Sequence, residues 1–157
     1  MLNAGIMTVE EFEDSIHISM DKLPKPINVK TMPYPGFPTD MQAQMMAMMV
    51  ISEGNSKVTE TVFENRFMHV EELNRMGATI TTADRSANIE GPAKLVGCDV
   101  CATDLRAGAA MIIAGLMANG TTIVEKLHHI DRGYENFEDK FVALGGDIHR
   151  VQVVSEF

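Results

Sequence analysis

Cysteine, basic residues and long apolar runs are all scarce in this sequence. Only 2 of its 157 residues are cysteine, so disulfides cannot hold the fold together and core packing has to stabilise it. Lysine and arginine number 13 against 22 acidic residues, and the net charge of −9 disfavours binding to DNA or RNA. The longest apolar runs, 45–51 and the glycine-containing 107–118, are shorter than the roughly 20 residues of a membrane-spanning helix. We therefore expect no nucleic-acid partner and no membrane segment.

The amino-terminal end lacks the features of a secretory signal. It reads MLNAGIMTVEEFEDS, which contains no basic residue and turns acidic at once. The small number of cysteines is also typical of a reducing compartment. We therefore expect a cytoplasmic protein that consists of one domain or of a piece of one.

Hydrophobic periodicity predicts alternating strands and helices. A short half-buried strand within 14–20 precedes a rigid, proline-rich loop over 21–38. The remaining predicted elements are a methionine-rich helix over 41–53, a strand over 57–63, an amphipathic helix that ends at Gly77, two short strands around a turn at 84–86, and a strand over 94–103.

The pattern starts again at Thr103, which indicates an internal duplication. Asp40 and Asp104 are 64 residues apart, and two further pairs, Gly54 with Gly120 and Arg66 with Arg132, are each 66 apart. Each unit reads strand, Thr-Asp, buried helix, glycine, strand, loop with arginine, amphipathic helix, glycine, strand. The last of these strands is expected at 147–154.

The duplication divides the chain into three parts. Residues 1–38 are the end of a preceding repeat with the proline-rich loop, and 39–102 and 103–157 are two repeat units. We expect the two helices that begin after Asp40 and Asp104 to pack beside each other, which would bring their N-termini to one rim.

Asp40 and Asp104 each stand where a predicted strand ends and a helix begins. In one interpretation each is an N-cap, which accepts hydrogen bonds from backbone N–H groups and contributes about 1 kcal/mol. In the other, the carboxylate takes a proton from a substrate hydroxyl, for which it has to be free and next to a cleft. Periodicity does not decide between these interpretations.

Three arginines lie in or just before the first turn of a predicted helix: Arg66, Arg106 and Arg132. The helix dipole disfavours a cation at this place and favours an anion. Three guanidinium groups there could form a clamp for phosphate or carboxylate. The alternative is that each arginine forms a weak exposed ion pair with a neighbouring acid; the candidates are Glu64, Asp104 and Asp131.

No motif predicts a metal or a nucleotide cofactor. Cys98 and Cys101 form a single C-x-x-C, but residues three apart in a strand point to opposite faces, and no second pair completes four ligands. His69, His128 and His129 lack metal-ligand spacing, and the 13 methionines are interpreted as adaptable core residues. The glycine-rich loops that bind nucleotide phosphates have no counterpart in the sequence.

Four long strings carry a family signature: PYPGFPTDMQAQ (33–44), TETVFENRFMHVEELNRMGA (59–78), ATDLRAGAA (102–110) and HIDRGYENFEDKFVALGGDI (129–148). In this order, over nearly the whole chain, they resemble the UDP-N-acetylglucosamine 1-carboxyvinyltransferases, a family of enolpyruvyl transferases. The related shikimate-pathway transferase shares the architecture but not the FPTDMQ and TVFENRF strings.

The resemblance implies an α/β (α+β) fold, namely an EPSP synthase-like inside-out α/β barrel of repeated βαβαββ units, here incomplete. It also implies a reaction without a cofactor. The enolpyruvyl group of phosphoenolpyruvate moves to the 3-hydroxyl of UDP-N-acetylglucosamine, and phosphate leaves through a tetrahedral ketal intermediate. This reaction is the first committed step of peptidoglycan synthesis.

The same resemblance implies roles for single residues. Asp40 would contact the sugar hydroxyl and serve as the base, and Val62 would contact the UDP-sugar through its backbone. The arginines that would surround phosphoenolpyruvate and the intermediate are Arg66, Arg106 and Arg132, and Arg132 would be catalytic together with Asp40. Fixed guanidinium groups in a closed site suit this chemistry, because both substrate anions carry charge that has to be held in place. Asp104 is expected to orient Arg106.

The chain departs from the family in its length. An intact enzyme carries, upstream, a Lys-Asn pair and a mobile loop whose Cys, or Asp in some members, acts as the acid, and Cys98 and Cys101 do not match that loop. We therefore expect the C-terminal part of the enzyme, inactive without the missing N-terminal part. The alternative is a non-catalytic module, built of the same repeats, that binds an anion or a protein partner.

Overall fold

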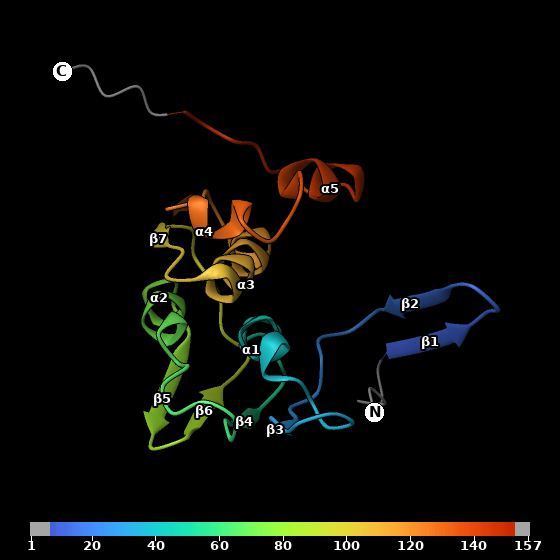
Figure 1. Ribbon diagram of the computed structural model, residues 1–157, viewed down its shortest axis with the longest axis vertical. Helices are drawn as coiled ribbons and strands as arrows, with labels where there is room; N and C mark the ends of the chain where they lie inside the picture. Colours follow the sequence, from blue (N-terminus) through green and yellow to red (C-terminus); the bar gives the residue numbers. More distant parts are fainter. Residues whose placement is uncertain (1–6, 153–157) are drawn as a thin grey trace.

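Two parallel βαβ crossovers organise the chain. The computed structural model describes residues 7–152 and shows three small sheets, two of which have helices packed on them (Figure 1). In the first crossover, β3 (Asn28–Lys30) pairs in parallel with β4 (Asn55–Thr59). A 3-10 turn, η1 (Thr39–Met41), leads into helix α1 (Gln42–Met49) between these two strands.

The second crossover repeats this arrangement with another parallel pair of strands. Its elements are β7 (Asp99–Cys101), α3 (Leu105–Met117) and β8 (Ile123–Glu125). The correspondence extends to single hydrogen bonds: the N–H of Thr31 bonds to the carbonyl of Thr59, and the N–H of Ala102 bonds to the carbonyl of Glu125. The sequence repeat thus has a structural counterpart, while the boundaries at 39–102 and 103–157 stay predictions.

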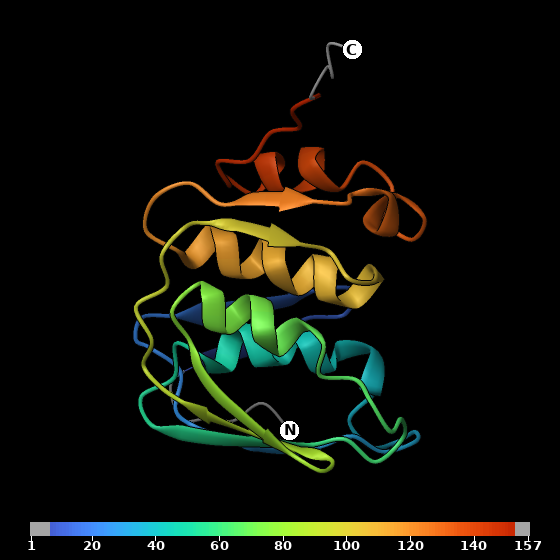
Figure 2. The same ribbon diagram turned by 90° about the vertical axis from the view of Figure 1, so that its left-hand side faces the viewer.

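Helices α1 and α3 lie side by side, as the repeat predicts. Figure 2 shows them, with α2 (His69–Arg75), as a helical layer between the four-stranded sheet that contains β4 and the pair β7–β8. Several methionines fill this layer, and the fully buried ones are Met46, Met49, Met76 and Met111. The interpretation of all 13 methionines as core residues is wrong for the four that are exposed, namely Met20, Met32, Met41 and Met68, and Met1 lies outside the described residues.

The two short strands predicted around the turn at 84–86 form as a hairpin. Strand β5 (Thr79–Ala83) pairs antiparallel with β6 (Ser86–Glu90), and Asp84 adopts the left-handed conformation that such a tight turn needs. β6 also pairs with β4, which gives the sheet order β3-β4-β6-β5. Gly77 ends α2 with a positive φ of 100°, as expected for a glycine after a helix.

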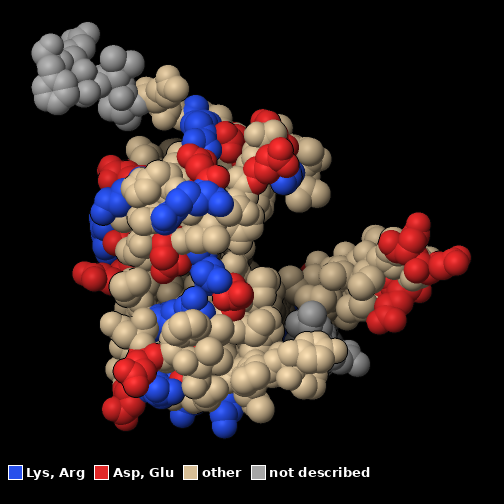
Figure 3. Space-filling view, viewed as in Figure 1, with Lys and Arg blue, Asp and Glu red and all other residues tan. Residues whose placement is uncertain are grey.

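An antiparallel hairpin of β1 (Met7–Glu11) and β2 (Ile16–Met20) projects from the rest of the chain (Figure 1). The strand predicted within 14–20 is therefore present, but the prediction that it is half-buried is wrong, because every residue of β2 is exposed. Figure 3 shows that acidic side chains gather at the far end of this hairpin.

Several elements are shorter than their patterns predict. The helix expected over 41–53 ends at Met49, the strand expected over 57–63 ends at Thr59, and the strand expected over 94–103 is limited to β7. The spacing of apolar residues reports which side chains are buried. Buried side chains continue past the last backbone hydrogen bond of an element, so the pattern predicts elements that are too long. The proline-rich loop over 21–38 also contributes a strand, β3.

The prediction of a strand at 147–154 is wrong for residues 147–152, which form no strand. Residues 153–154 lie outside the described residues. The C-terminal half of the second unit instead holds two short helices, α4 (His128–Asp131) and α5 (Phe137–Ala143). None of the helices within 7–152 is long and apolar enough to cross a membrane.

Candidate active site

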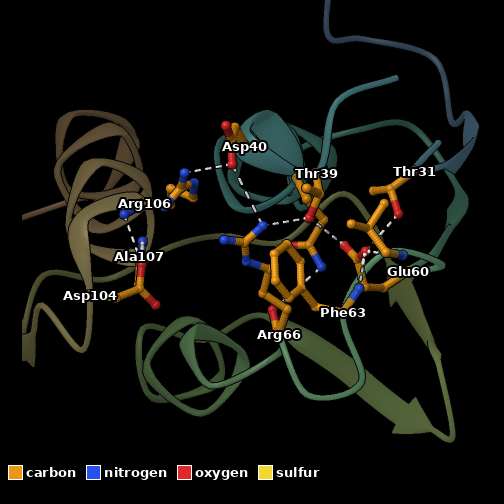
Figure 4. A network of polar contacts seen from close by, with 11 residues as sticks. Thr31, Thr39, Asp40, Glu60, Phe63, Arg66, Asp104, Arg106 and Ala107 are labelled. Atoms are coloured by element: carbon orange, nitrogen blue, oxygen red, sulfur yellow. Dashed lines mark hydrogen bonds and ion pairs between the residues drawn. The ribbon is translucent and has the colours of Figure 1, made fainter. Parts of the chain in front are cut away.

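Asp40 lies where the N-terminal ends of the two crossover helices meet. It belongs to η1, just before α1, and Arg106 belongs to the first turn of α3. Arg106 Nη2 lies 2.5 Å from Asp40 Oδ1, and Arg66 Nη1, from the loop between β4 and α2, lies 3.6 Å from the same oxygen (Figure 4). The predicted rim therefore exists, and two of the three predicted arginines meet at the predicted base.

The Asp40 carboxylate remains accessible within this cluster. Its side chain is 63% exposed, whereas the Arg66 and Arg106 side chains are 22% and 32% exposed. Within residues 7–152, Asp40 accepts no hydrogen bond that caps η1 or α1. The N-cap interpretation is therefore wrong for Asp40.

Asp104 is the residue that caps a helix. Its Oδ1 accepts hydrogen bonds from the backbone N–H of Arg106 at 2.8 Å and of Ala107 at 3.0 Å. The expectation that Asp104 orients Arg106 has to be corrected, because Asp104 binds the backbone of Arg106, while the guanidinium group points to Asp40. The capping geometry turns the Asp104 carboxylate toward its own helix.

Arg66 is held from two sides. Its Nη1 donates a hydrogen bond of 2.6 Å to Thr39 Oγ1, and its guanidinium carbon lies 4.1 Å from the centre of the Phe63 ring. Such a contact between a cation and an aromatic face is attractive and restricts the guanidinium plane. Arg66 is therefore fixed by both the loop that carries it and the turn that carries Asp40.

A buried carboxylate that the sequence analysis did not single out lies behind this cluster. Glu60 is 1% exposed and accepts hydrogen bonds from two hydroxyl groups and two backbone N–H groups. Burial opposes its ionisation, but the hydrogen bonds from Thr31, Val62, Phe63 and Thr39 outweigh burial and lower the pKa of Glu60. In the sequence, Glu60 is one acid after a β-branched run, and nothing marks it as buried.

Val62 lies beside this carboxylate and is 42% exposed. Its backbone N–H donates a 2.8 Å hydrogen bond to Glu60 Oε1. Because this N–H group is used internally, the backbone contact predicted for Val62 would have to come from its carbonyl oxygen.

Arg132 lies apart from the other predicted residues. It follows α4 and donates a 2.9 Å hydrogen bond to His129 Nδ1. Desolvation, together with the charges of His128 and Arg132, lowers the pKa of His129, so the neutral ring can accept this bond. Within residues 7–152, no hydrogen bond or ion pair joins Arg132 to Asp40. The predicted role of Arg132 stays a prediction.

The acids named as alternative partners of the three arginines are engaged elsewhere. Asp104 caps α3, Glu64 lies 3.7 Å from Arg85, and Asp131 forms two hydrogen bonds with Arg150. The ion-pair alternative is therefore wrong in its choice of partners.

Asp131 and Arg132 also line an open polar hollow of about 570 Å³ at the C-terminal end of the chain. Among the described residues, no three His, Cys, Asp or Glu side chains gather closely enough to hold a metal ion. Cys98 and Cys101 are free and half-buried, and only Cys101 belongs to a strand.

The family model for EPSP synthase (3-phosphoshikimate 1-carboxyvinyltransferase) matches residues 2–141. Among curated relatives, the UDP-N-acetylglucosamine 1-carboxyvinyltransferase 1 of Clostridium perfringens is 60% identical over 139 residues, which cover 88% of this chain and 33% of the relative. The UDP-N-acetylglucosamine 1-carboxyvinyltransferase 2 of Carboxydothermus hydrogenoformans is 57% identical over 152 residues, which cover 96% and 36%. The chain thus spans about a third of the length of these relatives.

Solved structures give the same picture of the fold. The enolpyruvyl transferase NikO from Streptomyces tendae superimposes with a TM-score of 0.82 at 30% identity, over 90% of this chain and 33% of that chain. EPSP synthase from Acinetobacter baumannii superimposes with a TM-score of 0.57 at 17% identity, over 82% and 33%. The chain therefore has a mixed α/β, EPSP synthase-like fold, and its described residues do not close a barrel.

Proposed function

The chain belongs to the EPSP synthase (3-phosphoshikimate 1-carboxyvinyltransferase) family, and on this premise we propose that it is the C-terminal part of a cytoplasmic UDP-N-acetylglucosamine 1-carboxyvinyltransferase. The complete enzyme transfers the enolpyruvyl group of phosphoenolpyruvate to the 3-hydroxyl of UDP-N-acetylglucosamine, as the first committed step of peptidoglycan synthesis. The names and identities of the curated relatives support this choice of substrates. The missing part of the enzyme would complete the inside-out barrel and the site.

The chemistry begins at the 3-hydroxyl, whose proton Asp40 accepts. The hydroxyl oxygen then forms a bond to C2 of phosphoenolpyruvate, while C3 takes a proton from an acid outside this chain. The product of this addition is a tetrahedral ketal. Loss of a C3 proton and departure of phosphate from C2 restore the double bond and leave the enolpyruvyl ether.

Arg66 and Arg106 hold the carboxylate and phosphate groups of phosphoenolpyruvate in this scheme, and Arg132 joins them when the site closes. A guanidinium group presents several donors in one plane and suits both anions. In the free chain, the Asp40 carboxylate lies on the two guanidinium groups where a substrate anion would bind. Binding of phosphoenolpyruvate therefore displaces Asp40 from the arginines and frees it for the sugar hydroxyl.

One observation carries the proposal: two arginines from different repeats contact the same oxygen of an exposed aspartate. A surface ion pair needs only one cation, and isolated exposed pairs contribute little to stability. Two guanidinium groups beside one exposed carboxylate combine positive charge, which binds an anionic group, with a proton acceptor for an alcohol. The transfer of an anionic group to an alcohol requires both.

The test reassembles the enzyme. The chain is mixed with a separately produced segment that covers the missing N-terminal part, and release of phosphate is measured with phosphoenolpyruvate and UDP-N-acetylglucosamine. We expect no turnover by the chain alone and turnover by the mixture. Asp40→Ala should lower the rate by a factor of about 100 or more, whereas Glu71→Ala, at an exposed position of α2, should not.

The proposal fails if the mixture assembles and releases no phosphate, or if Asp40→Ala turns over as fast as the unmodified mixture. Anion binding by the chain, measured calorimetrically with phosphoenolpyruvate, would then favour the alternative of a non-catalytic binding module. Turnover by the chain alone would refute its assignment as a partial enzyme.

A further inference from the structure

Glu60 connects the two segments that carry the arginine cluster. We propose that Glu60 and Thr39 form a positioning relay that holds the guanidinium group of Arg66 at Asp40. The assignment of phosphoenolpyruvate as the anion that Arg66 then binds rests on the proposed function. The relay itself is a property of the chain and is tested separately below.

The relay is a continuous line of short hydrogen bonds. Arg66 Nη1 lies 2.6 Å from Thr39 Oγ1, and Thr39 Oγ1 lies 2.9 Å from Glu60 Oε2 (Figure 4). A guanidinium group has only donors, so the Thr39 oxygen accepts from Arg66 and its own hydrogen goes to Glu60. Each bond therefore involves a charged group, which makes it stronger than a bond between neutral groups.

The second oxygen of Glu60 fixes the loop that carries Arg66. Oε1 accepts hydrogen bonds from the backbone N–H of Val62 at 2.8 Å and of Phe63 at 3.1 Å. The Phe63 ring in turn lies under the guanidinium group of Arg66. Through one carboxylate, Glu60 thus restrains Arg66 by the hydroxyl of Thr39 and by the aromatic ring of Phe63.

Thr31 completes the anchor at the end of β3. Its hydroxyl donates to Glu60 Oε1 at 2.8 Å and accepts from the backbone N–H of Thr61 at 2.9 Å. Since Thr31 is fully buried, Glu60 is attached to the sheet and not to a mobile surface segment. The relay therefore connects Arg66, at the exposed site, to residues that are buried in the core.

The second repeat provides an internal comparison. By the spacing of 66 residues, Lys126 stands at the position of Glu60, and Ala102 takes the place of Thr31 in the backbone pairing. The parallel crossover forms there without a buried carboxylate. Within residues 7–152, the hydroxyl of Thr103, the counterpart of Thr39, is buried without a hydrogen-bond partner.

This difference separates a structural role from a positioning role. Burying a carboxylate costs free energy that its hydrogen bonds have to offset. The second repeat folds into the same crossover without this cost, so the crossover itself does not require Glu60. What the first repeat has in addition is an arginine held by the hydroxyl that Glu60 binds.

The test measures how tightly Arg66 is held in the 157-residue chain. Phenylglyoxal reacts with accessible arginine side chains, and mass spectrometry of the Arg66 peptide gives the rate. The exposed Arg150, whose partners Asp131 and Glu138 are unchanged in every variant, is the internal standard. Thr39→Val removes the hydroxyl at nearly constant volume, and Thr39→Ser restores it. Glu60→Gln keeps the side-chain shape and removes the charge. Glu72→Gln is the matched control, because the Glu72 carboxylate also accepts a backbone N–H, that of Cys101, away from the site.

We expect Thr39→Val and Glu60→Gln to speed the modification of Arg66 about fivefold or more and to weaken phosphoenolpyruvate binding by a similar factor. Thr39→Ser should restore most of the slow modification and of the phosphoenolpyruvate affinity. Glu72→Gln should change neither the modification rate nor the affinity. The thermal midpoint of Thr39→Val should stay near that of the parent chain. An unchanged thermal midpoint would show that Arg66 has become more mobile while the fold as a whole is as stable as before.

The relay is refuted if Arg66 in Thr39→Val reacts at the parent rate, or if Glu72→Gln speeds its modification as much as Glu60→Gln. If the parent chain binds no phosphoenolpyruvate in the calorimeter, and the reassembled enzyme none either, the proposed function fails. The modification rates of Arg66 still decide the relay in that case, so the two failures are distinguishable.

Discussion

Asp40 and Asp104 occupy equivalent positions in the two repeats, yet only Asp104 caps its helix. Asp104 has an extended backbone with φ of −156°, and its carboxylate folds back onto the first N–H groups of α3. Asp40 lies inside a 3-10 turn, so its carboxylate points away from α1 and meets two guanidinium groups. The duplication therefore places an acid at both helix starts and leaves one of them free for chemistry.

This difference predicts unequal effects on stability. Asp104→Ala should lower the free energy of unfolding by about 1 kcal/mol, because it removes a cap that satisfies two N–H groups. Asp40→Ala should change it by about 0.5 kcal/mol or less, because an exposed ion pair contributes little. Urea unfolding measures both, and Asp104→Asn, which preserves the cap, is the control. Equal losses for the two alanine variants would contradict the assignment of Asp104 as the only cap.

The buried His69 should make the stability of the chain depend on pH. Burial against the sulfur of Met46 lowers the pKa of His69 from 6.5 to about 4, although the Asp104 charge acts in the opposite direction. Between these two values the unfolded chain binds a proton that the folded chain does not. Stability therefore falls as pH decreases, by about 2 kcal/mol from about pH 7 to about pH 5.

The measurement compares urea midpoints at these two pH values. His69→Leu removes the titrating group, so its midpoint should depend less on pH than that of the parent chain. Carboxyl groups with pKa values lowered by hydrogen bonds, Glu60 among them, are present in both the parent chain and the variant and contribute equally to the two. If parent and variant lose the same stability, His69 is not the group responsible.

Arg150 should hold the C-terminal segment in place. It forms hydrogen bonds to both oxygens of Asp131 and to both oxygens of Glu138, and these bonds lower the pKa values of the two acids. Arg150→Gln should speed limited proteolysis within 147–152 about tenfold, while the global free energy of unfolding changes by about 1 kcal/mol at most. Arg75→Gln, which removes an exposed pair on α2, serves as the control. An unchanged cleavage rate in Arg150→Gln would show that other contacts fix this segment.

Gly97 should be intolerant of a side chain. A Cβ at this position would lie 2.3 Å from the carbonyl oxygen of Thr121, and the N–H of Gly97 is tied to the carbonyl of Asn119. Gly97→Ala should therefore destabilise the chain by about 2 kcal/mol or more, as thermal unfolding would show. Adding Thr121→Ala should not rescue it, because the clashing atom belongs to the backbone. A stable Gly97→Ala chain would mean that the two loops separate easily.

Much of the fold follows from local patterns. The spacing of methionines places α1, the Asp-Arg-Ser turn places the β5–β6 hairpin, and a glycine marks the end of α2. The duplication also predicts that α1 and α3 pack together, since two copies of one unit bury the same helix face. In the site, it predicts that the N-termini of the two helices share one rim, and Asp40 meets Arg106 at this rim.

Other features escape the pattern because they depend on partners far along the chain. The strand expected at 147–154 does not form in 147–152, where no neighbouring strand supplies its hydrogen bonds within the described residues. Glu60 resembles any exposed acid in the sequence, and it becomes a buried hub only because Thr31, 29 residues away, lies beside it. Arg132 resembles Arg66 in its spacing, but it binds its helix neighbour His129 instead of Asp40.

The sequence by itself determined the repeat, the family and the set of residues from which a site could be built, because these depend on residue order and on short-range periodicity. Only the tertiary structure decided which of two equivalent aspartates is a cap and which faces two arginines. That choice depends on the backbone angle at each helix start and on the packing of α1 against α3, and neither is encoded in the spacing of the residues concerned.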